Sequence, residues 1–257
     1  MDCRTAAPIR RIYMIYCTGD THGSQLTWTE QIEPVLAPGD TLIVSGDFGI
    51  GFWDGPYWSE EEFFDHISRQ NFSVLFADGN HENFDRLESY PAEMWNGGRV
   101  HKIRHNLLHL MRGEVYDMEG KAIFVFGGGH SFDRYMRQEH VSWWPREMPS
   151  EEEYLNGERN LRQVNDQVDY IITHTAPSES VYYLSTIRKL GIKNDGSEEF
   201  PLTGFLDSVQ KRTAYQRWYF GHFHVDMELW RNQTAIFSTV RELASGRIVR
   251  QWQPCEG

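Results

Sequence analysis

The stretch Thr41-Leu-Ile-Val-Ser45, which runs directly into Gly46-Asp47, predicts how the chain folds. A short apolar run with β-branched residues that ends at Gly-Asp is typical of a buried strand followed by a loop that carries a carboxylate. Four other short apolar runs end at polar residues in the same way. They are residues 12–16 before Asp20 and His22, residues 72–76 before Asn80 and His81, residues 170–172 before His174, and residues 218–220 before His222 and His224.

Each of these predicted strands delivers its polar residues at its carboxyl-terminal end. In an open α/β sheet this edge is where ligands bind, so we expect one site built from five loops on one rim. Residues 25–36 and 59–70 are predicted to be helices between the first three strands, and Ser59 with Glu62 fits a capping box. The first part of the chain therefore predicts a βαβαβ unit.

The length of 257 residues, without a linker or low-complexity segment, predicts a single domain over residues 1–257. A segment around residues 130–165 is interpreted as an insertion that shapes substrate access. The net charge of −12 argues against a basic nucleic-acid-binding face. It does not exclude a phosphate substrate, because bound divalent ions can invert the local field.

The cysteines and the apolar runs bear on where the protein works. Cys3, Cys17 and Cys255 have neither paired spacing nor a Cys-x-x-Cys motif, which favours a reducing compartment. The N-terminal residues do not resemble a signal peptide, and no apolar run is long enough to span a membrane. We therefore expect a cytoplasmic protein with no membrane partner; the oligomeric state cannot be predicted from the sequence.

The polar residues at the strand ends suit metal binding. Asp20 and His22 are two residues apart in a loop, and a carboxylate and an imidazole are donors to a first-row divalent cation. Asp47 follows the next strand, and Asn80-His81 the one after it. Taken singly, each motif has an ordinary alternative: Asp20 and Asp47 as turn formers, His22 as an exposed loop residue, and His81 as part of a surface pair.

Taken together, the five motifs resemble the calcineurin-like metallophosphoesterase superfamily. They are, in chain order, Gly19-Asp20-Thr21-His22-Gly23, Gly46-Asp47, Gly79-Asn80-His81-Glu82, Thr173-His174 and Gly221-His222-Phe223-His224. Five ordered blocks are far more specific than any one of them. The resemblance runs from about residue 12 to residue 224 and implies an α/β fold: a four-layer α/β/β/α sandwich of two mixed β-sheets flanked by helices.

The resemblance also implies a centre of two divalent metal ions with a shared carboxylate. By matching motif, Asp20, His22 and His224 would hold one ion, Asn80, His174 and His222 would hold the other, and Asp47 would bridge them. His81 would protonate or stabilise the leaving group, and a hydroxide that bridges the ions would attack the phosphate ester. Manganese is the expected metal, with iron, zinc or nickel as alternatives, because the donors are nitrogen and oxygen without thiolate.

Three further residues are candidates for substrate contacts. Gly127-Gly-Gly129 follows a predicted strand at residues 122–126, and glycines allow the backbone to approach the metal centre closely. His130 and Arg134 come next and could touch a phosphate, unless the glycines form a flexible turn and Arg134 a surface ion pair. Arg104, in a stretch at residues 100–111 read as strand, could be a rim contact or part of a solvated turn.

The remaining segments carry weaker predictions. Residues 114–116 are expected to form a strand, and residues 227–240 and 246–252 closing antiparallel strands. Residues 132–158 lack the sheet pattern, although a helix is expected to start at Ser150. Trp143-Trp144 is interpreted as a hydrophobic plug, with base stacking as the alternative. Residues 189–202 are expected to help shape access to the site.

The second motif bears on the class of ester. In the protein phosphatases of the superfamily it continues into Val-Asp-Arg-Gly, whose arginine grips phosphate, whereas here residues 48–54 supply neither that Asp nor that Arg. The partner of His81 is left open, and the missing arginine favours phosphodiesters, either nucleotides or nucleic acid. The alternatives are a phosphomonoesterase, such as a protein or nucleotide phosphatase, and a catalytically silent, metal-stabilised binding scaffold.

Overall fold

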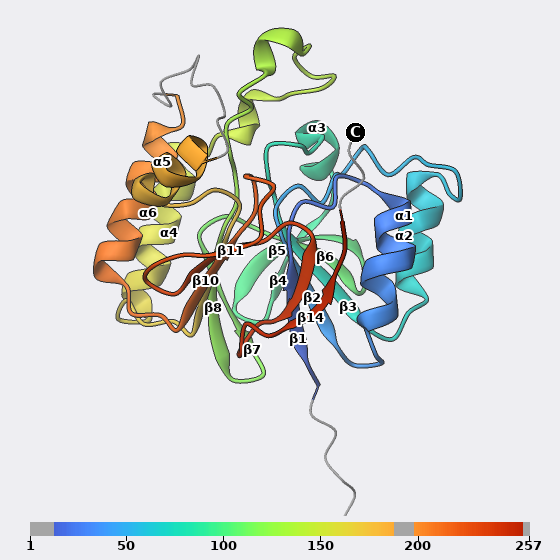
Figure 1. The fold of residues 1–257 in the computed structure, drawn as a ribbon, viewed down its shortest axis with the longest axis horizontal. Coiled ribbons are helices and arrows are strands. Elements are labelled where there is room, and N and C mark those ends of the chain that lie inside the picture. Colours follow the sequence, from blue (N-terminus) through green and yellow to red (C-terminus); the bar gives the residue numbers. More distant parts are fainter. Residues whose placement is uncertain (1–12, 188–197, 254–257) are drawn as a thin grey trace, which may run out of the picture.

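Two mixed β-sheets form the centre of the molecule, and helices cover the outer face of each (Figure 1). The computed structural model describes residues 13–187 and 198–253. One sheet contains β1 (Ile15–Thr18), β2 (Thr41–Ser45), β3 (Ser73–Ala77), β4 (Ala92–Trp95), β5 (Gly98–Arg104), β6 (Leu107–Leu110), β13 (Thr239–Glu242) and β14 (Ile248–Gln251). The other contains β7 (Glu114–Met118), β8 (Lys121–Phe126), β9 (Tyr170–Thr173), β10 (Arg217–Phe220), β11 (Met227–Glu228) and β12 (Gln233–Ala235).

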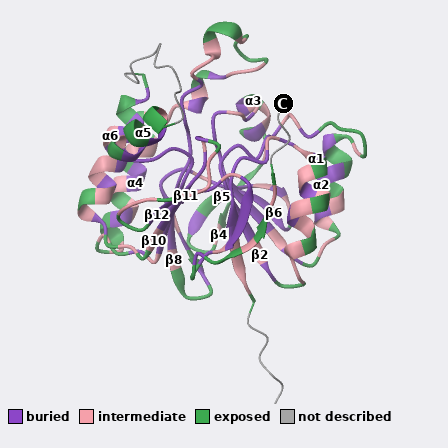
Figure 2. Ribbon diagram, in the orientation of Figure 1, coloured by how far each residue is buried: buried purple, intermediate pink, exposed green. Residues whose placement is uncertain are grey.

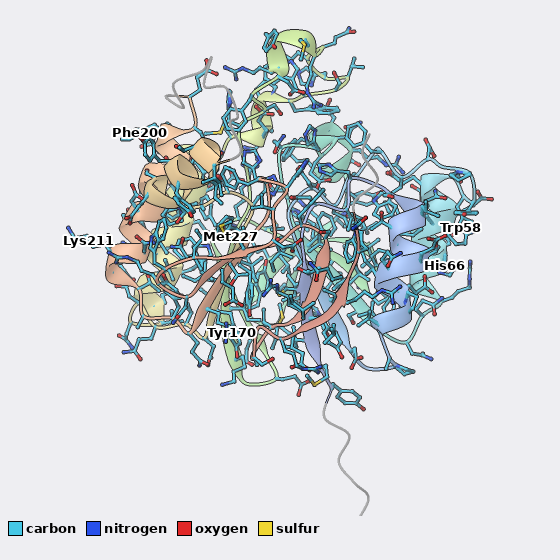
Figure 3. The ribbon with its side chains drawn as sticks, viewed as in Figure 1. Trp58, His66, Tyr170, Phe200, Lys211 and Met227 are labelled. Carbon is cyan, nitrogen blue, oxygen red and sulfur yellow. The ribbon has the colours of Figure 1, made fainter. Side chains whose placement is uncertain are left out.

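The helices fall into two groups, one on each side of the sheets. The first group, α1 (Gln25–Thr27), α2 (Glu60–Ser68) and α3 (Phe84–Leu87), follows strands of the first sheet. The second group is α4 (Glu151–Gln163), α5 (Ser178–Ile187) and α6 (Phe200–Arg212). Figure 3 shows Trp58 and His66, whose rings stack 4.7 Å apart, on the α1–α2 side and Phe200 and Lys211 on the opposite side. The predicted four-layer α/β/β/α architecture is confirmed.

Three buried apolar layers hold the sandwich together, and the side-chain alternation of the strands builds them. In β2, Leu42 and Val44 pack toward α2, whereas Ile43 packs between the two sheets. In β9, Ile172 joins the layer between the sheets and Ile171 the layer beneath α4 to α6. Since successive strand residues point to opposite faces, apolar strands of this kind bury both faces of each sheet. Figure 2 shows the resulting buried centre.

Parallel strands bring five loops to one rim of the sandwich. β1, β2 and β3 are parallel neighbours in the first sheet, and β9 and β10 are parallel neighbours in the second. Hydrogen bonds join these loops within each sheet, because Gly221 N donates to His174 O and His22 N donates to Asp47 O. The two sheets are joined at the rim by His174 Nδ1, which lies 3.1 Å from the carbonyl oxygen of Ser45. The predicted rim is therefore formed, although β1 runs over Ile15–Thr18 and residue 12 lies outside the described residues.

Two predicted elements differ in the structure. Residues 100–111 form a hairpin rather than one strand, since β5 and β6 are antiparallel and residues 105 and 106 make the turn. Residues 25–36 are helical but irregular: α1 continues as a π-helix over Trp28–Ile32 and a 3₁₀ helix over Glu33–Val35. Pro34 explains the ending, because proline lacks an N–H donor and clashes with the preceding turn. Ser59 caps α2 with Glu62, as predicted.

The segment between β8 and α4 projects above the rim (Figure 1). It contains two short 3₁₀ helices, Arg134–Met136 and Pro145–Glu147. Ser150 begins α4 through a capping box with Glu153, and Leu161 of α4 packs in the outer apolar layer. The later part of the expected insertion is therefore the outer helix α4, and we use the name insertion loop for residues 127–149.

The last strands cross from one sheet to the other. β11 and β12 are antiparallel, as predicted for residues 227–240, but β12 also pairs with β10, and that pairing is parallel. The chain then passes to β13, which pairs antiparallel with β1. The carboxylate of Asp226 holds this crossing by accepting from Phe237 N (3.1 Å) and Ser238 N (2.9 Å). No helix among the described residues is long and apolar enough to cross a membrane.

Candidate metal centre

The structure brings together all seven residues predicted as metal ligands, with His81 beside them. Five of them adopt the left-handed backbone region that non-glycine residues seldom occupy: Asp20 (φ 28°), His22 (φ 46°), Asp47 (φ 51°), His222 (φ 69°) and His224 (φ 49°). Such residues cost free energy and concentrate at functional sites, where the surrounding structure holds them in place. The sharp turns after the strands are what aim these side chains into one space.

His174 shows how one group of donors is oriented. Its Nδ1 donates to the carbonyl oxygen of Ser45 at 3.1 Å, which leaves the lone pair on Nε2. That nitrogen faces Asn80 Oδ1 at 3.0 Å and Asp47 Oδ1 at 3.3 Å. The amide nitrogen of Asn80 donates to Ser131 Oγ at 3.1 Å, so its oxygen is the atom turned toward His174. Three lone-pair donors thus converge with no proton between them, an arrangement that a cation would stabilise.

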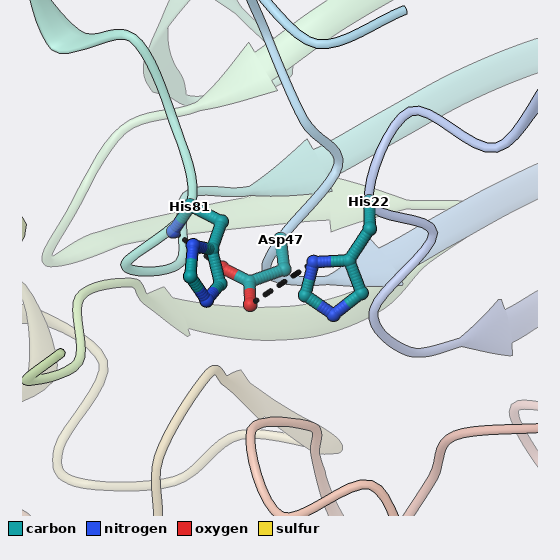
Figure 4. A group of neighbouring side chains, drawn as sticks. All are labelled: His22, Asp47 and His81. Atoms are coloured by element: carbon teal, nitrogen blue, oxygen red, sulfur yellow. Dashed lines mark hydrogen bonds and ion pairs between the residues drawn. The ribbon is translucent and has the colours of Figure 1, made fainter. Parts of the chain in front are cut away.

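The other carboxylate oxygen of Asp47 faces a second group. Asp47 Oδ2 lies 3.7 Å from His22 Nδ1, and His22 Nε2 lies 3.0 Å from His224 Nε2. Figure 4 shows Asp47 between His22 and His81, whose backbone N–H donates to Asp47 Oδ1 at 2.8 Å. Among the described residues, two sets of His, Asp or Glu side chains lie close enough to hold a metal ion, and Asp47 belongs to both: one with His22 and His81, the other with Asp20 and His174. A carboxylate in this position can be shared.

Asp20 and His222 contribute buried polar atoms that the rest of the protein leaves unpaired. Asp20 Oδ1 accepts from His222 N at 3.1 Å, but Asp20 Oδ2 is buried without a hydrogen-bond partner. His222 Nε2 is also buried without one, and Glu199 Oε1 lies 3.6 Å away. Buried polar atoms are normally hydrogen-bonded, so each of these requires an explanation. A divalent ion held by these residues would explain the unpaired oxygen of Asp20.

The electrostatics of the site agree with cation binding. Burial lowers the pKa of His22 to about 4 and the pKa of His222 well below its ordinary value, so both are neutral, as metal ligands must be. Burial and the neighbouring Asp47 raise the pKa of Asp20. Burial also acts to raise the pKa of Asp47, but His174, His81 and His22 outweigh it and lower that pKa. The nitrogen and oxygen donors, without thiolate, therefore fit first-row divalent ions.

The glycine-rich start of the insertion loop reaches the centre, as the sequence predicts. A Cβ on Gly129 would lie 2.9 Å from His174 Cδ2 and 3.4 Å from Asn80 Oδ1, so only glycine fits there. Ser131, which accepts from Asn80, donates its backbone N–H to Glu147 Oε1 at 3.0 Å. The insertion loop therefore fixes the orientation of the Asn80 side-chain amide through Ser131.

Sequence reasoning did not identify the residues that face His81. Arg137 Nη1 lies 3.2 Å from His81 Nδ1, and Arg137 Nη2 lies 3.5 Å from His81 Nε2. Asp133 holds this guanidinium, accepting from Nε at 2.6 Å and from Nη2 at 2.8 Å. The spacing of Asp133 and Arg137, four residues apart, is a weak signal by itself. Nothing in the sequence distinguishes Arg137 from Arg134 as the residue that turns inward.

The three candidate substrate residues lie in different places. Arg104 is not brought to the rim, which corrects the predicted contact: it pairs with Leu107 at the start of β6, the opposite end of the sheet. Its Nε and Nη2 bind Asp65 Oδ1 (2.8 Å) and Glu61 Oε2 (2.6 Å) of α2 instead. The hairpin turn explains the error, because it reverses the chain after Arg104.

His130 and Arg134 are both paired with Glu198. His130 Nε2 lies 2.6 Å from Glu198 Oε2, and Arg134 binds the same carboxylate while its guanidinium lies 5.3 Å from the centre of the Trp143 ring. A direct contact of either residue with substrate stays a prediction. Trp144 is 1% exposed and donates to Asp85 Oδ2 at 2.8 Å, which agrees with the interpretation as a hydrophobic plug.

Comparison with protein families gives a match that covers most of the chain. Residues 13–226 match the family model described as calcineurin-like phosphoesterase. The matched range contains all seven candidate ligands and His81, as well as Asp133 and Arg137 of the insertion loop. No curated protein matches the chain.

Proposed function

Because the chain belongs to the calcineurin-like phosphoesterase family, we propose that it hydrolyses phosphate esters at a centre of two divalent metal ions on the rim. The observation that carries this proposal is the position of Asp47. One of its oxygens lies 3.3 Å from His174 Nε2 and the other 3.7 Å from His22 Nδ1, so two groups of donors meet on one carboxylate. Two-metal hydrolysis uses ions about 3.5–4 Å apart, and a carboxylate shared by two groups of donors suits that spacing.

The assignment of ligands is the one given by the matching motifs, although the structure groups Asp20 with Asp47 and His174 rather than with His22. Asp20, His22 and His224 hold one ion, Asn80, His174 and His222 hold the other, and Asp47 is common to both. When bound, the ions supply Lewis acidity to the phosphoryl oxygens and a nucleophile derived from water at neutral pH. The chain orients its own donors for this purpose, because Ser45 fixes the tautomer of His174 and Ser131 fixes the amide of Asn80. We assign manganese as the resident metal.

His81 is assigned to the leaving group. Its backbone N–H is tied to Asp47, which places the ring beside the ligands without requiring it to be one. The pKa of His81 is lowered, mainly by burial. Asp47 acts to raise this pKa, and Arg137 acts to lower it further. A histidine in this position donates a hydrogen bond or a proton to the oxygen that departs from phosphorus.

The position of Arg137 bears on whether the substrate is a phosphodiester, as the sequence favoured, or a phosphomonoester. Phosphodiesters were favoured because the second motif lacks an arginine, but Arg137 of the insertion loop lies beside His81. The absence of an arginine is therefore no longer a reason to favour a diester substrate. A phosphomonoester becomes the alternative to test. The cytoplasmic location stays a prediction. The thiol of Cys17 is buried and forms no disulfide among the described residues, and Cys3 and Cys255 lie outside them.

The test is hydrolysis of p-nitrophenyl phosphate and bis-p-nitrophenyl phosphate by metal-stripped protein, with and without added manganese. We expect turnover that depends on metal and that falls roughly 100-fold or more in His81→Ala, within the range of general acid catalysis. His81→Ala should still bind both ions. Two tightly bound ions with no turnover of either ester would favour the binding scaffold over the enzyme.

A further inference from the structure

The insertion loop places a guanidinium against the residue assigned to the leaving group. Arg137 follows the 3₁₀ helix Arg134–Met136, and its two terminal nitrogens face the two ring nitrogens of His81 at 3.2 Å and 3.5 Å. The Arg137 side chain is 22% exposed, so a ligand can reach it from outside. The arginine therefore lies at the entrance to the candidate metal centre.

The other side of this guanidinium is anchored. An arginine has five N–H donors in a rigid plane. Asp133 accepts from Nε and from Nη2, and the carbonyl oxygen of Ser142 accepts from Nη1 at 3.0 Å. These contacts account for three donors and leave one N–H on each terminal nitrogen. The two that remain lie on the edge that faces His81.

His81 cannot satisfy both of these donors. A neutral imidazole accepts a hydrogen bond at one ring nitrogen, and a protonated imidazole accepts none. The pair of N–H groups is thus a preformed fork with more donors than its neighbour can accept. Such a fork matches two oxygens of a carboxylate or a phosphate group.

We propose that Arg137, positioned by Asp133, binds the phosphoryl group of the substrate and makes the site selective for phosphomonoesters. This inference rests on the proposed phosphoesterase function. A monoester phosphate has three non-bridging oxygens and carries up to two negative charges, whereas a diester has two such oxygens and one charge. With metal ions engaging part of the group, the additional charged oxygen of a monoester is the acceptor that suits the Arg137 fork. In a diester a second alcohol occupies that position and accepts poorly.

The experiment compares both nitrophenyl esters as substrates of the manganese-loaded protein of residues 1–257 and its variants. Arg137→Gln removes the charge and the fork, Arg137→Lys keeps the charge alone, and Asp133→Asn loosens the anchor. Arg162→Gln is the matched control, since Arg162 is exposed on α4 and pairs with Glu158 of the same helix at 3.0 Å. Circular dichroism and bound manganese are measured for each variant, which separates loss of fold or metal from loss of the fork.

For Arg137→Gln we expect kcat/KM for the monoester to fall on the order of 100-fold, as for loss of charge-assisted hydrogen bonds. For the diester the fall should be less than about 5-fold, because the Arg137 fork has no charged third oxygen to bind there. The kcat/KM of Arg137→Lys and of Asp133→Asn for the monoester should lie between the values for Arg137→Gln and the parent. The effect of Asp133→Asn should be mainly on KM. Inorganic phosphate, titrated calorimetrically into manganese-loaded protein, should bind Arg137→Gln more weakly by a similar factor.

The outcomes separate this inference from the function on which it rests. If the parent hydrolyses neither ester with any divalent metal, the proposed function fails, and the inference fails with it. If the parent is active but Arg137→Gln leaves activity unchanged, or lowers both esters equally, the monoester inference is overturned while the enzyme assignment stands. A selective loss on the monoester and on phosphate binding, with Arg162→Gln unchanged, supports it.

Discussion

Asp78 lies directly before the Gly79-Asn80 turn, and replacing it with asparagine should cost the protein a large part of its stability. Asp78 is 1% exposed, and its Oδ2 accepts from Arg112 Nε at 2.8 Å and from Arg112 Nη2 at 2.5 Å. Its Oδ1 lies 3.1 Å from His109 Nε2. Arg112 is itself buried and also donates to the backbone oxygen of Arg146 at 2.8 Å. The variant Asp78→Asn therefore removes the nearer counter-ion of a buried guanidinium, and Glu153 Oε2, 3.4 Å from Arg112 Nη1, is the carboxylate that remains.

The magnitude follows from the loss of the nearer carboxylate partner of Arg112. Removing one partner of a buried ion pair costs about 3–5 kcal/mol, and asparagine retains one acceptor oxygen, so we expect about 3 kcal/mol. This is a substantial fraction of the roughly 5–15 kcal/mol that stabilises a typical domain. With a urea dependence near 3 kcal/mol per molar, the unfolding midpoint should shift by about 1 M.

The pH dependence has a definite sign. Burial raises the pKa of Asp78, but Arg112 and His109 outweigh it, so the folded-state pKa lies below the ordinary value. A depressed folded-state pKa gives stability that is present above the unfolded pKa of about 4 and is lost as the pH falls further. The difference between parent and Asp78→Asn should therefore be complete at pH 7 and shrink in acid.

The assay is urea denaturation of metal-stripped parent, Asp78→Asn, Arg112→Met and the double variant at pH 7. We expect the double variant to lose less stability than the sum of the single variants, because it contains neither charge. A loss below about 1 kcal/mol for Asp78→Asn, or additive losses in the double variant, would refute the reasoning, since breaking a buried pair should cost more.

Two further predictions concern the support of the candidate centre. Burial raises the pKa of Glu147 from 4.5 to about 7, a shift equivalent to about 3 kcal/mol that favours the folded state below pH 4.5 and is lost as the pH rises through 7. The free energy of unfolding of Glu147→Gln, measured by urea denaturation, should therefore rise relative to that of the parent by up to about 3 kcal/mol between pH 4.5 and pH 8. A difference between the two proteins that does not change with pH would contradict this. A Cβ on Gly79 would overlap Asp47 Oδ1, so Gly79→Ala should lose metal affinity by calorimetry. Gly204→Ala, in α6 with no atom nearer than 4.0 Å, is the control and should bind metal like the parent.

The sequence predicted much of the candidate site because strand direction determines it. Asp47 and His174 each follow a short apolar strand, and parallel strands end at the same rim. The left-handed backbone conformation of His22 and His222 could not be predicted from the sequence. A residue other than glycine keeps this conformation only where the surrounding structure holds it. The motifs identified the residues, and the folded loops supplied their directions.

The errors have physical reasons as well. Arg104 was a candidate rim contact, with a solvated turn as the alternative, and the structure has a turn at residues 105 and 106 that reverses the chain. The edge strand β4 was missed, since Ala92–Trp95 is largely exposed and carries no alternating apolar pattern. Arg137 was missed because the insertion loop has no periodicity that would show which arginine faces inward. Its direction depends on Asp133 and Ser142, contacts that exist only in the folded chain.

The central claim is that Asp47 is shared by two metal ions, and the number of manganese ions bound per chain tests it most directly. Metal-stripped parent, Asp47→Asn and the charge-matched control Asp65→Asn would be equilibrated with manganese, freed of excess metal and measured by elemental mass spectrometry. We predict two ions in the parent and in Asp65→Asn, because Asp65 lies on α2, where it binds Arg104 and not the candidate centre. Asp47→Asn should lose at least one ion. A parent that binds no manganese, or an Asp47→Asn variant that binds the same two ions with unchanged affinity, would contradict the account.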